Sequence, residues 1–527
     1  MSLSDPFPAS IGNGVVLELQ DLDEKSKSLV PTEPFPAGYI ERQLEIDIGA
    51  QTGASEREDG RPDHSIHDVK CLAIHESPEH TSYSIRKPLF CDIYLGPLED
   101  SVGLINRSNI SLDITPLASG NPSKGEPNKP ITIPARSAGT LKPGAWAFSQ
   151  AGRSCTFQAL VFPCRYVLGV VAVSMQVVAG HKRDATTSQE DATSRGAATQ
   201  PVVENPILTR RLGCLSEMVT GEHARLYAPA ENEGEIERPE FYLSRMKRLG
   251  NTDSAVVFQA RHSGFAGQVI VVKALKPRSG RDLISRGGSW EAEMRVHLRI
   301  HSDQIVKLLG GDARIHVLFL ENIDAWDLSH EKWYDRDTDH KFRGTRDHAQ
   351  YILYDMARAL QYLRKQEILH NDIKPPNILF NGKKAVLIDF GLGTFDGSRA
   401  SNGGTPWYVP PEYSIESFEE QKREAPSDIW ALGIVMLYAL RRIRLPEAGL
   451  DVPSWLIKDV GTIQSVRAQM GKWLRKMRGE AEEIAAEDNK LGGIISRMLQ
   501  QRSQERITAD QLVSAMKAFI DPKPLVS

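Results

Sequence analysis

The segment 368–391, ILHNDIKPPNILFNGKKAVLIDFG, constrains this chain most, because it brings four polar side chains into a predicted strand-loop-strand: Asp372, Lys374, Asn377 and Asp389. A phosphoryl-transfer site needs a carboxylate to orient the attacking hydroxyl, a cation on the moving phosphate and hard oxygen ligands for Mg²⁺. All of these groups are present, so the segment predicts such a site. The alternative is a loop between strands whose Asp and Asn only cap turns.

The motif HNDIKPPN at 370–377 resembles the catalytic loop of the eukaryotic protein kinases, and DFG at 389–391 resembles their metal-binding tripeptide. The resemblance covers 238–520 and implies a bilobal protein-kinase fold of the α+β class. It also implies transfer of the ATP γ-phosphate with Mg²⁺. In that scheme Asp372 is the catalytic base or orienter and Lys374 stabilises charge, while the metal ligands are Asn377 and Asp389.

The segment LGNTDSAVV at 249–257 stands where this family has a hairpin with three glycines over the phosphates. Only Gly250 is kept, because Thr252 and Ala255 occupy the second and third glycine positions. The resemblance places Val257 on the adenine, but the loop backbone is less free to approach phosphate. Without this context the segment would predict an ordinary hairpin.

The following strand, VIVVKAL, contains Lys273, which resembles the lysine that binds the α- and β-phosphates, with Val271 on the adenine face. A lysine in a buried strand needs a partner. The next helix offers Glu291 and Glu293, which point about 200° apart, so only one can face the lysine. Counting back from the strand match at 305–308 favours Glu293.

The run VLFLENIDAWDL predicts a strand and then a hinge from Glu321 to Ile323, where the resemblance implies that adenine binds. Leu379 completes the nucleotide-binding residues. His297 falls where the family has an apolar residue and is interpreted as a packed core histidine. The polar insertion 329–345 is expected to keep its charges in solvent.

The segment from 404 to 412, GTPWYVPPE, resembles the substrate-docking loop of the family. Lys374 together with Thr405 is the serine/threonine-specific pattern, in which the threonine hydroxyl ties Asp372 to the lysine. Thr405 is therefore grouped with the catalytic residues. The docking loop disfavours a small-molecule phosphotransferase, because it serves a polypeptide substrate.

Two further carboxylates of this lobe need partners. Glu412 is expected to be buried and therefore to need a cation, and the resemblance implies that Arg506 is its partner. Asp428 opens a helix that is apolar nearly all round and is expected to anchor the catalytic loop, a role that is compatible with capping the helix.

Asn371 stands where many relatives carry an arginine that binds a phosphate on the activation segment. Its amide carries no charge, so we expect activity without phosphorylation of that segment. The alternative is that another cation, Arg399 or Lys384, replaces the arginine. The candidate phosphorylation sites are Thr394, Ser398 and Ser401.

The N-terminal half has a different character. Residues 1–65 have the composition of a flexible arm, and short apolar runs separated by turn residues over 66–180 predict an all-β sandwich. The run LINRSNISLDI is similar to a forkhead-associated domain, a phosphothreonine-binding sandwich, although a sandwich that binds nothing is the alternative. Arg107 and Arg136 are candidates for binding an anion or are simply solvated.

The composition of the remaining stretches sets the boundaries. Residues 181–237 are predicted to be a linker, since their first part is rich in Ser, Thr and Ala, and residues 521–527 form a tail. At 527 residues the chain is too long for one core. Its net charge of -4 makes no case for nucleic acid or membrane.

The five cysteines show no metal-ligand spacing, and the N-terminus lacks the pattern of a signal peptide. The apolar run at 166–179 is too short to span a bilayer. We therefore expect a cytoplasmic or nuclear protein.

The leading hypothesis is a serine/threonine protein kinase of a signalling pathway, a transferase that binds ATP and Mg²⁺ and acts on protein substrates. A phosphoprotein bound through the N-terminal domain is a second expected partner. The alternative is a pseudokinase or weakly active scaffold that binds a phosphorylated partner, which the depleted glycine loop favours.

Overall fold

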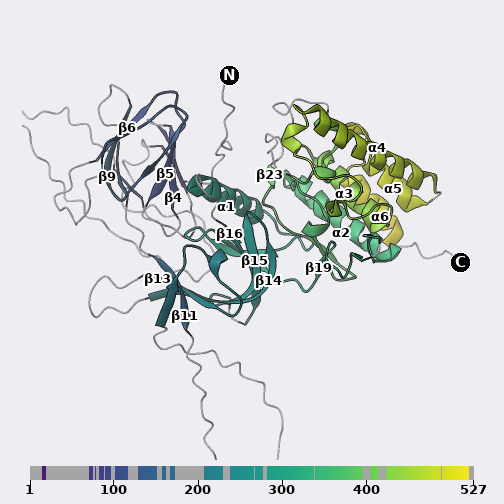
Figure 1. Cartoon of the computed structure of the whole chain (residues 1–527), viewed down its shortest axis with the longest axis horizontal. Helices are drawn as coiled ribbons and strands as arrows, with labels where there is room; N and C mark the ends of the chain where they lie inside the picture. Colours follow the sequence, from purple (N-terminus) through teal and green to yellow (C-terminus); the bar gives the residue numbers. More distant parts are fainter. Residues whose placement is uncertain are drawn as a thin grey trace, which may run out of the picture. The chain divides into compact units, whose positions relative to one another are not determined.

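The structure is a computed structural model of the whole chain (Figure 1). It describes residues 15–18, 71–74, 78, 82–87, 90–96, 101–116, 129–150, 157–161, 166–172, 207–228, 238–265, 267–276, 282–337, 339–395, 404–414, 423–487 and 489–520. The chain divides into two compact units, Met1–Gly287 with Asp312–Val317 and Gly288–Gly311 with Leu318–Ser527. Each helix among the described residues is too short or too polar to cross a lipid bilayer.

The first unit contains a β-sandwich of two five-stranded sheets, with the strand orders β1-β3-β4-β5-β8 and β2-β10-β9-β6-β7. The strands of the first sheet are β1 (Val15–Glu18), β3 (Ser82–Lys87), β4 (Cys91–Leu95), β5 (Val102–Asn106) and β8 (Ala138–Leu141). Those of the second are β2 (Cys71–Ile74), β6 (Leu112–Pro116), β7 (Ile131–Ile133), β9 (Gly144–Gln150) and β10 (Phe157–Val161). The predicted sandwich is confirmed, because apolar residues of both sheets share one core, among them Ile93, Leu104, Ile114, Trp146 and Phe148.

The strand β1 lies inside the segment predicted to be a flexible arm, 1–65. It pairs in parallel with β3 at the edge of the first sheet. Its sequence, VVLE, begins with two β-branched residues, which favour an extended backbone. The other residues of the predicted arm, and the predicted tail 521–527, lie outside the described residues.

The first unit also contains six strands of a second β-structure, in the order β12-β11-β13-β14-β15-β16. They are β11 (Val167–Ala172), β12 (Ile207–Arg211), β13 (His223–Ala228), β14 (Arg238–Asn251), β15 (Ala255–His262) and β16 (Val269–Leu275). Three of these strands come from residues assigned by sequence to the sandwich or to the linker 181–237. The run that forms β11 was expected to be a strand of the sandwich, whereas β12 and β13 lie in the predicted linker and were missed, although HARLYA in β13 buries Ala224 and Leu226 completely.

Arg314 joins distant parts of the first unit. Its guanidinium makes a bidentate ion pair with Asp312, with N–O distances of 2.7 and 3.0 Å, and lies 4.3 Å from the ring centroid of Tyr166, just before β11. Glu240, on β14, is a second carboxylate at 3.8 Å. The Arg314 and Asp312 side chains are only 2% and 5% exposed, so this pair is shielded from solvent.

We predict that Arg314→Ala destabilises the first unit strongly, since it leaves Asp312 buried without a cation. Removing one partner of a buried pair costs about 3–5 kcal/mol. Arg314→Lys is the matched control, because it keeps the charge and loses only the bidentate fork. Urea unfolding of the full chain, followed by circular dichroism, measures both variants. A change below about 0.5 kcal/mol for Arg314→Ala, the size of an ordinary surface substitution, would contradict the prediction.

The second unit is mainly helical. Its helices are α1 (Asp282–Leu298, of which the larger part lies here), α2 (Arg346–Lys365), α3 (Ala425–Ala439), α4 (Gln464–Ala486), α5 (Lys490–Met498) and α6 (Ala509–Ile520). Its strands are β17 (Leu308–Asp312), β18 (Val317–Glu321), β19 (Trp326–Asp327), β20 (Ile368–Leu369), β21 (Ile378–Phe380), β22 (Ala385–Leu387) and β23 (Thr394–Phe395). The α+β class is therefore confirmed.

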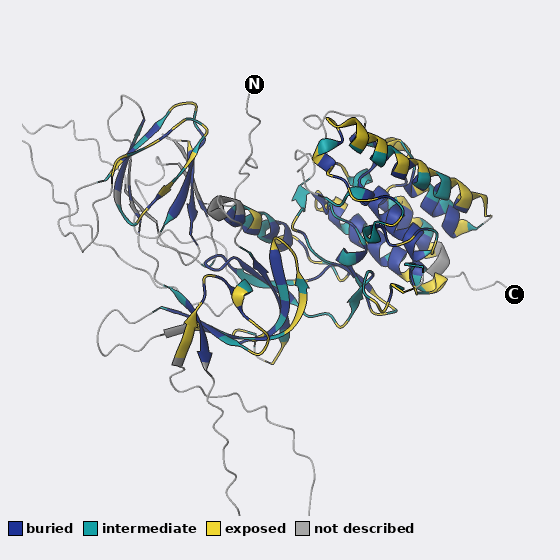
Figure 2. Cartoon of the chain, in the orientation of Figure 1, coloured by how far each residue is buried: buried dark blue, intermediate teal, exposed yellow. Residues whose placement is uncertain are grey.

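Helix α3 forms the centre of this unit, and Figure 2 shows it almost wholly in the colour of buried residues. Every residue from Asp428 to Ala439 is buried, as expected for a helix that is apolar all round. Helix α2 packs beside it through a stripe of buried apolar residues at helical spacing, which includes Ile352, Met356 and Leu363. Both helices begin or end next to the catalytic loop and give it a rigid support.

The insertion 329–345 is more firmly held than its polar sequence indicates. Trp333 and Phe342 are buried, with ring centroids 5.9 Å apart, and the Trp333 indole donates a hydrogen bond of 3.0 Å to the carbonyl oxygen of Phe380. Several of its charged residues, such as Lys332 and Arg336, are exposed as predicted. The two aromatic residues therefore anchor a loop whose charges face the solvent.

Candidate active site

The catalytic loop follows β20, and hydrogen bonds to Asp428 in the first turn of α3 hold it in place. The Asp428 carboxylate accepts hydrogen bonds from the backbone amides of His370 and Asn371, at 2.8 and 2.9 Å. Burial raises the pKa of this carboxyl group, while those two hydrogen bonds act in the opposite direction. The structure thus forms the anchor that the sequence predicted, and two successive amides fix where Asp372 begins.

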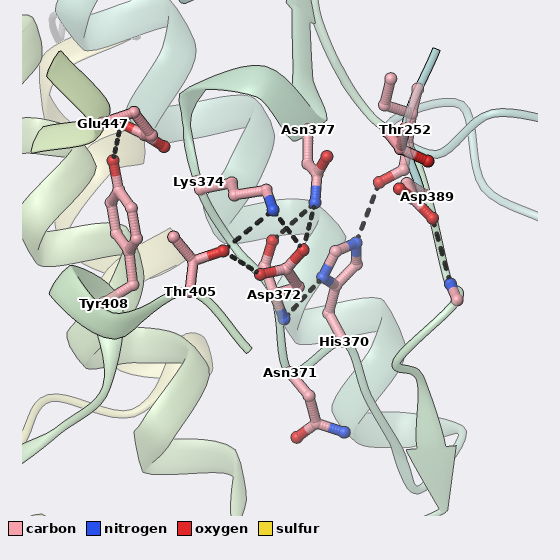
Figure 3. A network of polar contacts seen from close by, with 12 residues as sticks. Thr252, His370, Asn371, Asp372, Lys374, Asn377, Asp389, Thr405, Tyr408 and Glu447 are labelled. Atoms are coloured by element: carbon pink, nitrogen blue, oxygen red, sulfur yellow. Dashed lines mark hydrogen bonds and ion pairs between the residues drawn. The ribbon is translucent and has the colours of Figure 1, made fainter. Parts of the chain in front are cut away.

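Asp372 is the centre of a polar cluster that Figure 3 shows at close range. Its Oδ1 accepts a hydrogen bond of 2.8 Å from the Thr405 hydroxyl. Its Oδ2 lies 2.7 Å from Lys374 Nζ and accepts a bond of 3.0 Å from Asn377 Nδ2. Lys374 Nζ also donates to Thr405 Oγ1 at 2.9 Å. Asp372, Lys374, Asn377 and Thr405 are therefore brought together as predicted, and both oxygens of Asp372 are oriented.

The metal-ligand candidates fit a magnesium ion by their chemistry. Asn377 turns its Nδ2 toward Asp372, and its amide oxygen has no hydrogen-bond partner among the described residues. Asp389 has the unusual φ of 67°, and its Oδ1 accepts a bond of 3.2 Å from the Gly391 amide. An amide oxygen and a carboxylate are hard oxygen ligands of the kind that Mg²⁺ prefers.

The nucleotide-binding candidates of the first unit share one face of its sheet. Val257 on β15 lies directly opposite Lys273 on β16 and also opposite Gly250 on β14. Directly opposite residues project to the same side, as do residues two apart in a strand, so Val271 belongs to this face too. Lys273 and Val271 are buried. A Cβ at Gly250 would meet Val257 only at an ordinary 3.7 Å, so packing does not require glycine there.

The remaining nucleotide-binding candidates lie in the second unit. The Glu321 side chain accepts a bond of 2.8 Å from the Lys307 amide, so its carboxylate is used within the lobe. The Ile323 carbonyl accepts from the Ala325 amide at 2.9 Å, which forms a turn at the predicted hinge. Leu379 is the middle residue of β21 and partly buried. Their contact with adenine stays a prediction.

Helix α1 carries the two glutamates between which the sequence had to choose. Glu293 is 3% exposed, whereas Glu291 is only partly buried. Burial therefore favours Glu293 as the charge partner of a buried lysine. His297, one turn further, is buried and packs edge-on against Phe390 at 4.9 Å between ring centroids, as a core histidine would.

Asn371 contacts the start of the activation segment through neutral groups. Its Nδ2 donates to the Leu392 carbonyl at 2.9 Å and to the Thr394 hydroxyl at 2.8 Å. Next to it, β23 pairs with β20. The sequence missed Arg423, which is buried and donates a bond of 3.0 Å to the Asn371 carbonyl. No local motif marks an arginine so far along the chain as a neighbour.

Neither cation proposed from the sequence has a described contact with this region. Lys384 lies in the turn between β21 and β22, and Arg399 lies outside the described residues, as do Ser398 and Ser401. The expected ion pair of the lobe does form, with Arg506 donating bonds of 2.8 and 2.6 Å to Glu412, although only Arg506 is buried and the Glu412 side chain is 23% exposed.

The two arginines considered for the N-terminal domain differ in their surroundings. Arg107 is buried in the sandwich, and its Nε donates a bond of 2.7 Å to Asp92. Arg136 is exposed and donates to the Asn109 side chain at 3.1 Å. The buried ion pair gives Arg107 a role in the sandwich core. The similarity of this domain to a forkhead-associated domain stays a prediction.

In the hairpin at 249–257, the predicted phosphate-binding loop, two backbone amides make hydrogen bonds within the turn. The Thr252 amide donates to the Ala255 carbonyl at 2.9 Å, and the Ala255 amide donates to the Thr252 hydroxyl at 3.1 Å. Lys276, the residue after β16, also contacts this turn, because its Nζ donates a hydrogen bond to the Thr252 carbonyl. Two donors that a glycine loop would offer to phosphate are therefore already used.

We predict that the double change Thr252→Gly and Ala255→Gly lowers the Michaelis constant for ATP. It removes the competing hydroxyl and lets the backbone approach phosphate. One recovered hydrogen bond is worth about 1 kcal/mol, or roughly fivefold in affinity. Steady-state kinetics with varied ATP measures the effect, and Asn251→Gly is the matched control, since it adds flexibility without freeing an amide. Equal constants for the double variant and the wild type would contradict the prediction.

Comparison with known proteins agrees with this geometry. The family model of the protein kinase domain matches residues 243–516, just over half of the chain. Ribosomal protein S6 kinase alpha-2 of Mus musculus is 31% identical over 171 residues, which are 31% of this chain and 21% of that protein. Mitogen-activated protein kinase 13 of Arabidopsis thaliana is 36% identical over 107 residues, or 19% of this chain and 27% of that protein.

Extracellular signal-regulated kinase 1 of Candida albicans is 33% identical over 123 residues, which are 22% of this chain and 29% of that protein. The chain thus spans between a fifth and a third of the length of these relatives. The family model and the motifs at 370–377 and 389–391 cover the same part of the sequence. The chain belongs to the protein kinase domain family.

Proposed function

We propose that this chain is an active protein serine/threonine kinase that transfers the γ-phosphate of ATP to hydroxyl groups of protein substrates. The observation that carries the proposal is the Thr405 hydroxyl, which donates to Asp372 at 2.8 Å and accepts from Lys374 at 2.9 Å. This contact is the one expected from the serine/threonine-specific pattern of Lys374 and Thr405, and it supports the proposal. It places a carboxylate and a cation side by side, as phosphoryl transfer requires.

In this mechanism Asp372 accepts a hydrogen bond from the substrate hydroxyl and orients its oxygen toward phosphate. Lys374 balances negative charge that develops on the moving phosphoryl group. Asn377 and Asp389 would hold the Mg²⁺ that neutralises the phosphates of bound ATP. Lys273 would bind the α- and β-phosphates, with Glu293 as its charge partner.

A pseudokinase is the second candidate, and one observation favours it. The hairpin at 249–257 ties up the amides of Thr252 and Ala255, which weakens its expected hold on phosphate. Under either function we propose a cytoplasmic or nuclear location. A phosphoprotein bound by the sandwich remains part of the proposal, on the sequence similarity alone.

Transfer of labelled γ-phosphate to a degenerate Ser/Thr peptide library tests the proposal. Asp372→Ala, Lys273→Met and Asp389→Ala are each expected to lower the rate by at least about 10²–10⁴-fold, the usual contribution of one positioned catalytic group. Their melting temperatures should stay close to that of the wild type. Asp303→Ala, at a carboxylate that is 75% exposed, is the control. An unchanged rate in any of the three variants would remove the enzyme hypothesis.

We also predict activity without phosphorylation of the activation segment, because Asn371 holds Thr394 and Leu392 through neutral hydrogen bonds. Phosphatase-treated wild type and the double variant Ser398→Ala, Ser401→Ala should keep their initial rates. Thr394 is changed separately, since its hydroxyl is part of the contact. Loss of most activity in both samples would show that a phosphate switches the segment.

A further inference from the structure

Glu447 is a buried carboxylate that no motif of the sequence singled out. It lies in the 3-10 helix η6 (Pro446–Ala448), which follows α3. Its Oε2 accepts a hydrogen bond of 2.8 Å from the Tyr408 hydroxyl, and its Oε1 is buried with no hydrogen-bond partner among the described residues. An unpartnered buried carboxylate oxygen costs free energy, so its position calls for a functional reason.

Tyr408 connects this carboxylate to the catalytic cluster. It is the last residue of the 3-10 helix η4 (Pro406–Tyr408), whose N-cap is Thr405, and its amide donates to the Thr405 carbonyl at 3.0 Å. Among the described residues its hydroxyl bonds only to Glu447. Figure 3 shows the resulting path, with Thr405 between Tyr408 on one side and Asp372 and Lys374 on the other.

The groups around Glu447 disfavour its negative charge. Burial is the largest cause that raises its pKa to about 7, and Asp372 acts in the same direction, while the backbone amide of Glu447, the Tyr408 hydroxyl and Lys374 oppose them. Tyr438 on α3 and Tyr334 in the insertion 329–345 also feel its charge. Lys374 is the sole cation among the groups named here, and it is already bound to Asp372 and Thr405.

We propose that Glu447 is a positioning residue of the kinase: its ionised carboxylate holds Tyr408, and through Thr405 it keeps Asp372 and Lys374 in place, so that protonation of Glu447 slows phosphoryl transfer. A hydrogen bond to a charged acceptor is roughly twice as strong as one to a neutral acceptor. The protonated acid therefore holds Tyr408 less firmly. This inference rests on the proposed function.

Ionisation of Glu447 should also change the stability of the protein, in the direction opposite to its effect on activity. Its pKa is raised from 4.5 to about 7 in the folded protein. Between these values the folded protein keeps a proton that the unfolded chain has lost, so the free energy of unfolding falls as pH rises through this range. The ionised state that supports activity is the less stable one. Activity and stability are thus two independent measures of one titration.

Glu447→Gln tests the proposal, because the amide keeps the shape and can accept from Tyr408 but does not ionise. We expect the wild-type kcat to rise severalfold from about pH 6 to about pH 8, around the titration of a group near pH 7. The variant should lack this rise and keep a rate near the low-pH wild-type value at each pH. The Michaelis constant for ATP should not change. Glu505→Gln, at an exposed carboxylate, is the matched control and should keep the wild-type profile.

Tyr408→Phe gives an independent test of the path, since it removes the hydroxyl and leaves the ring. It should also lose the rise of kcat with pH. The double variant should be no slower than the slower single variant, because both changes break the same connection. Additive losses, or a Glu447→Gln profile that follows the wild type, would overturn the proposal.

Melting temperatures of the wild type and Glu447→Gln, measured from pH 5 to 8, separate this inference from the proposed function. The wild type should lose stability relative to the variant as pH rises, whether or not it transfers phosphate. If no protein shows transfer but the melting difference appears, the proposed function fails and the titration of Glu447 stands. A constant melting difference across this range would overturn the role of Glu447 by itself.

Discussion

The Asp428 carboxylate at the start of α3 supports the catalytic loop, and the other contacts of the site depend on it. It accepts hydrogen bonds from two successive backbone amides, those of His370 and Asn371, and thereby fixes the loop just before Asp372. Helix α3 is buried from Asp428 to Ala439, so this support cannot shift without disturbing the lobe core. Asp372 in turn gives Lys374, Asn377 and Thr405 a common partner. The hydrogen bonds from Asp428 fix the loop backbone, and the fixed backbone in turn orients the Asp372 carboxylate.

The activation segment is held by a different kind of contact. At this position many relatives have an arginine that binds a phosphate on the activation segment. Asn371 instead donates hydrogen bonds to the unmodified Thr394 hydroxyl and to the Leu392 carbonyl. An arginine binds the segment through charge only after phosphate has been added, whereas the Asn371 Nδ2 already makes both of its hydrogen bonds to the unmodified segment. Arg423 is present nearby, and it bonds to the Asn371 carbonyl.

Sequence motifs predicted the parts of the site that lie close together along the chain. Asp372, Lys374 and Asn377 fall within six residues, so their chemistry was visible at once. The pairing of Glu412 with Arg506 was found only through the family resemblance. The sequence did not predict Arg423 or Glu447, because tertiary packing brings them close to the catalytic loop and no local sequence pattern indicates that contact. The strands β12 and β13 were missed because their structure depends on long-range pairing, of β12 with β11 and of β13 with β11 and β14.

The sheet of the first unit has a consequence for how the kinase domain is isolated. The family match begins at residue 243, inside β14, but β14 pairs on one side with β13, which lies before that boundary. A chain cut at the start of the match would present the remaining part of β14 as an unpaired strand edge, with its amides and carbonyls open to other chains. Such edges recruit strands from neighbouring molecules. A piece of the chain that keeps β13 and β14 paired on both sides therefore begins before β11, well upstream of the start of the family match.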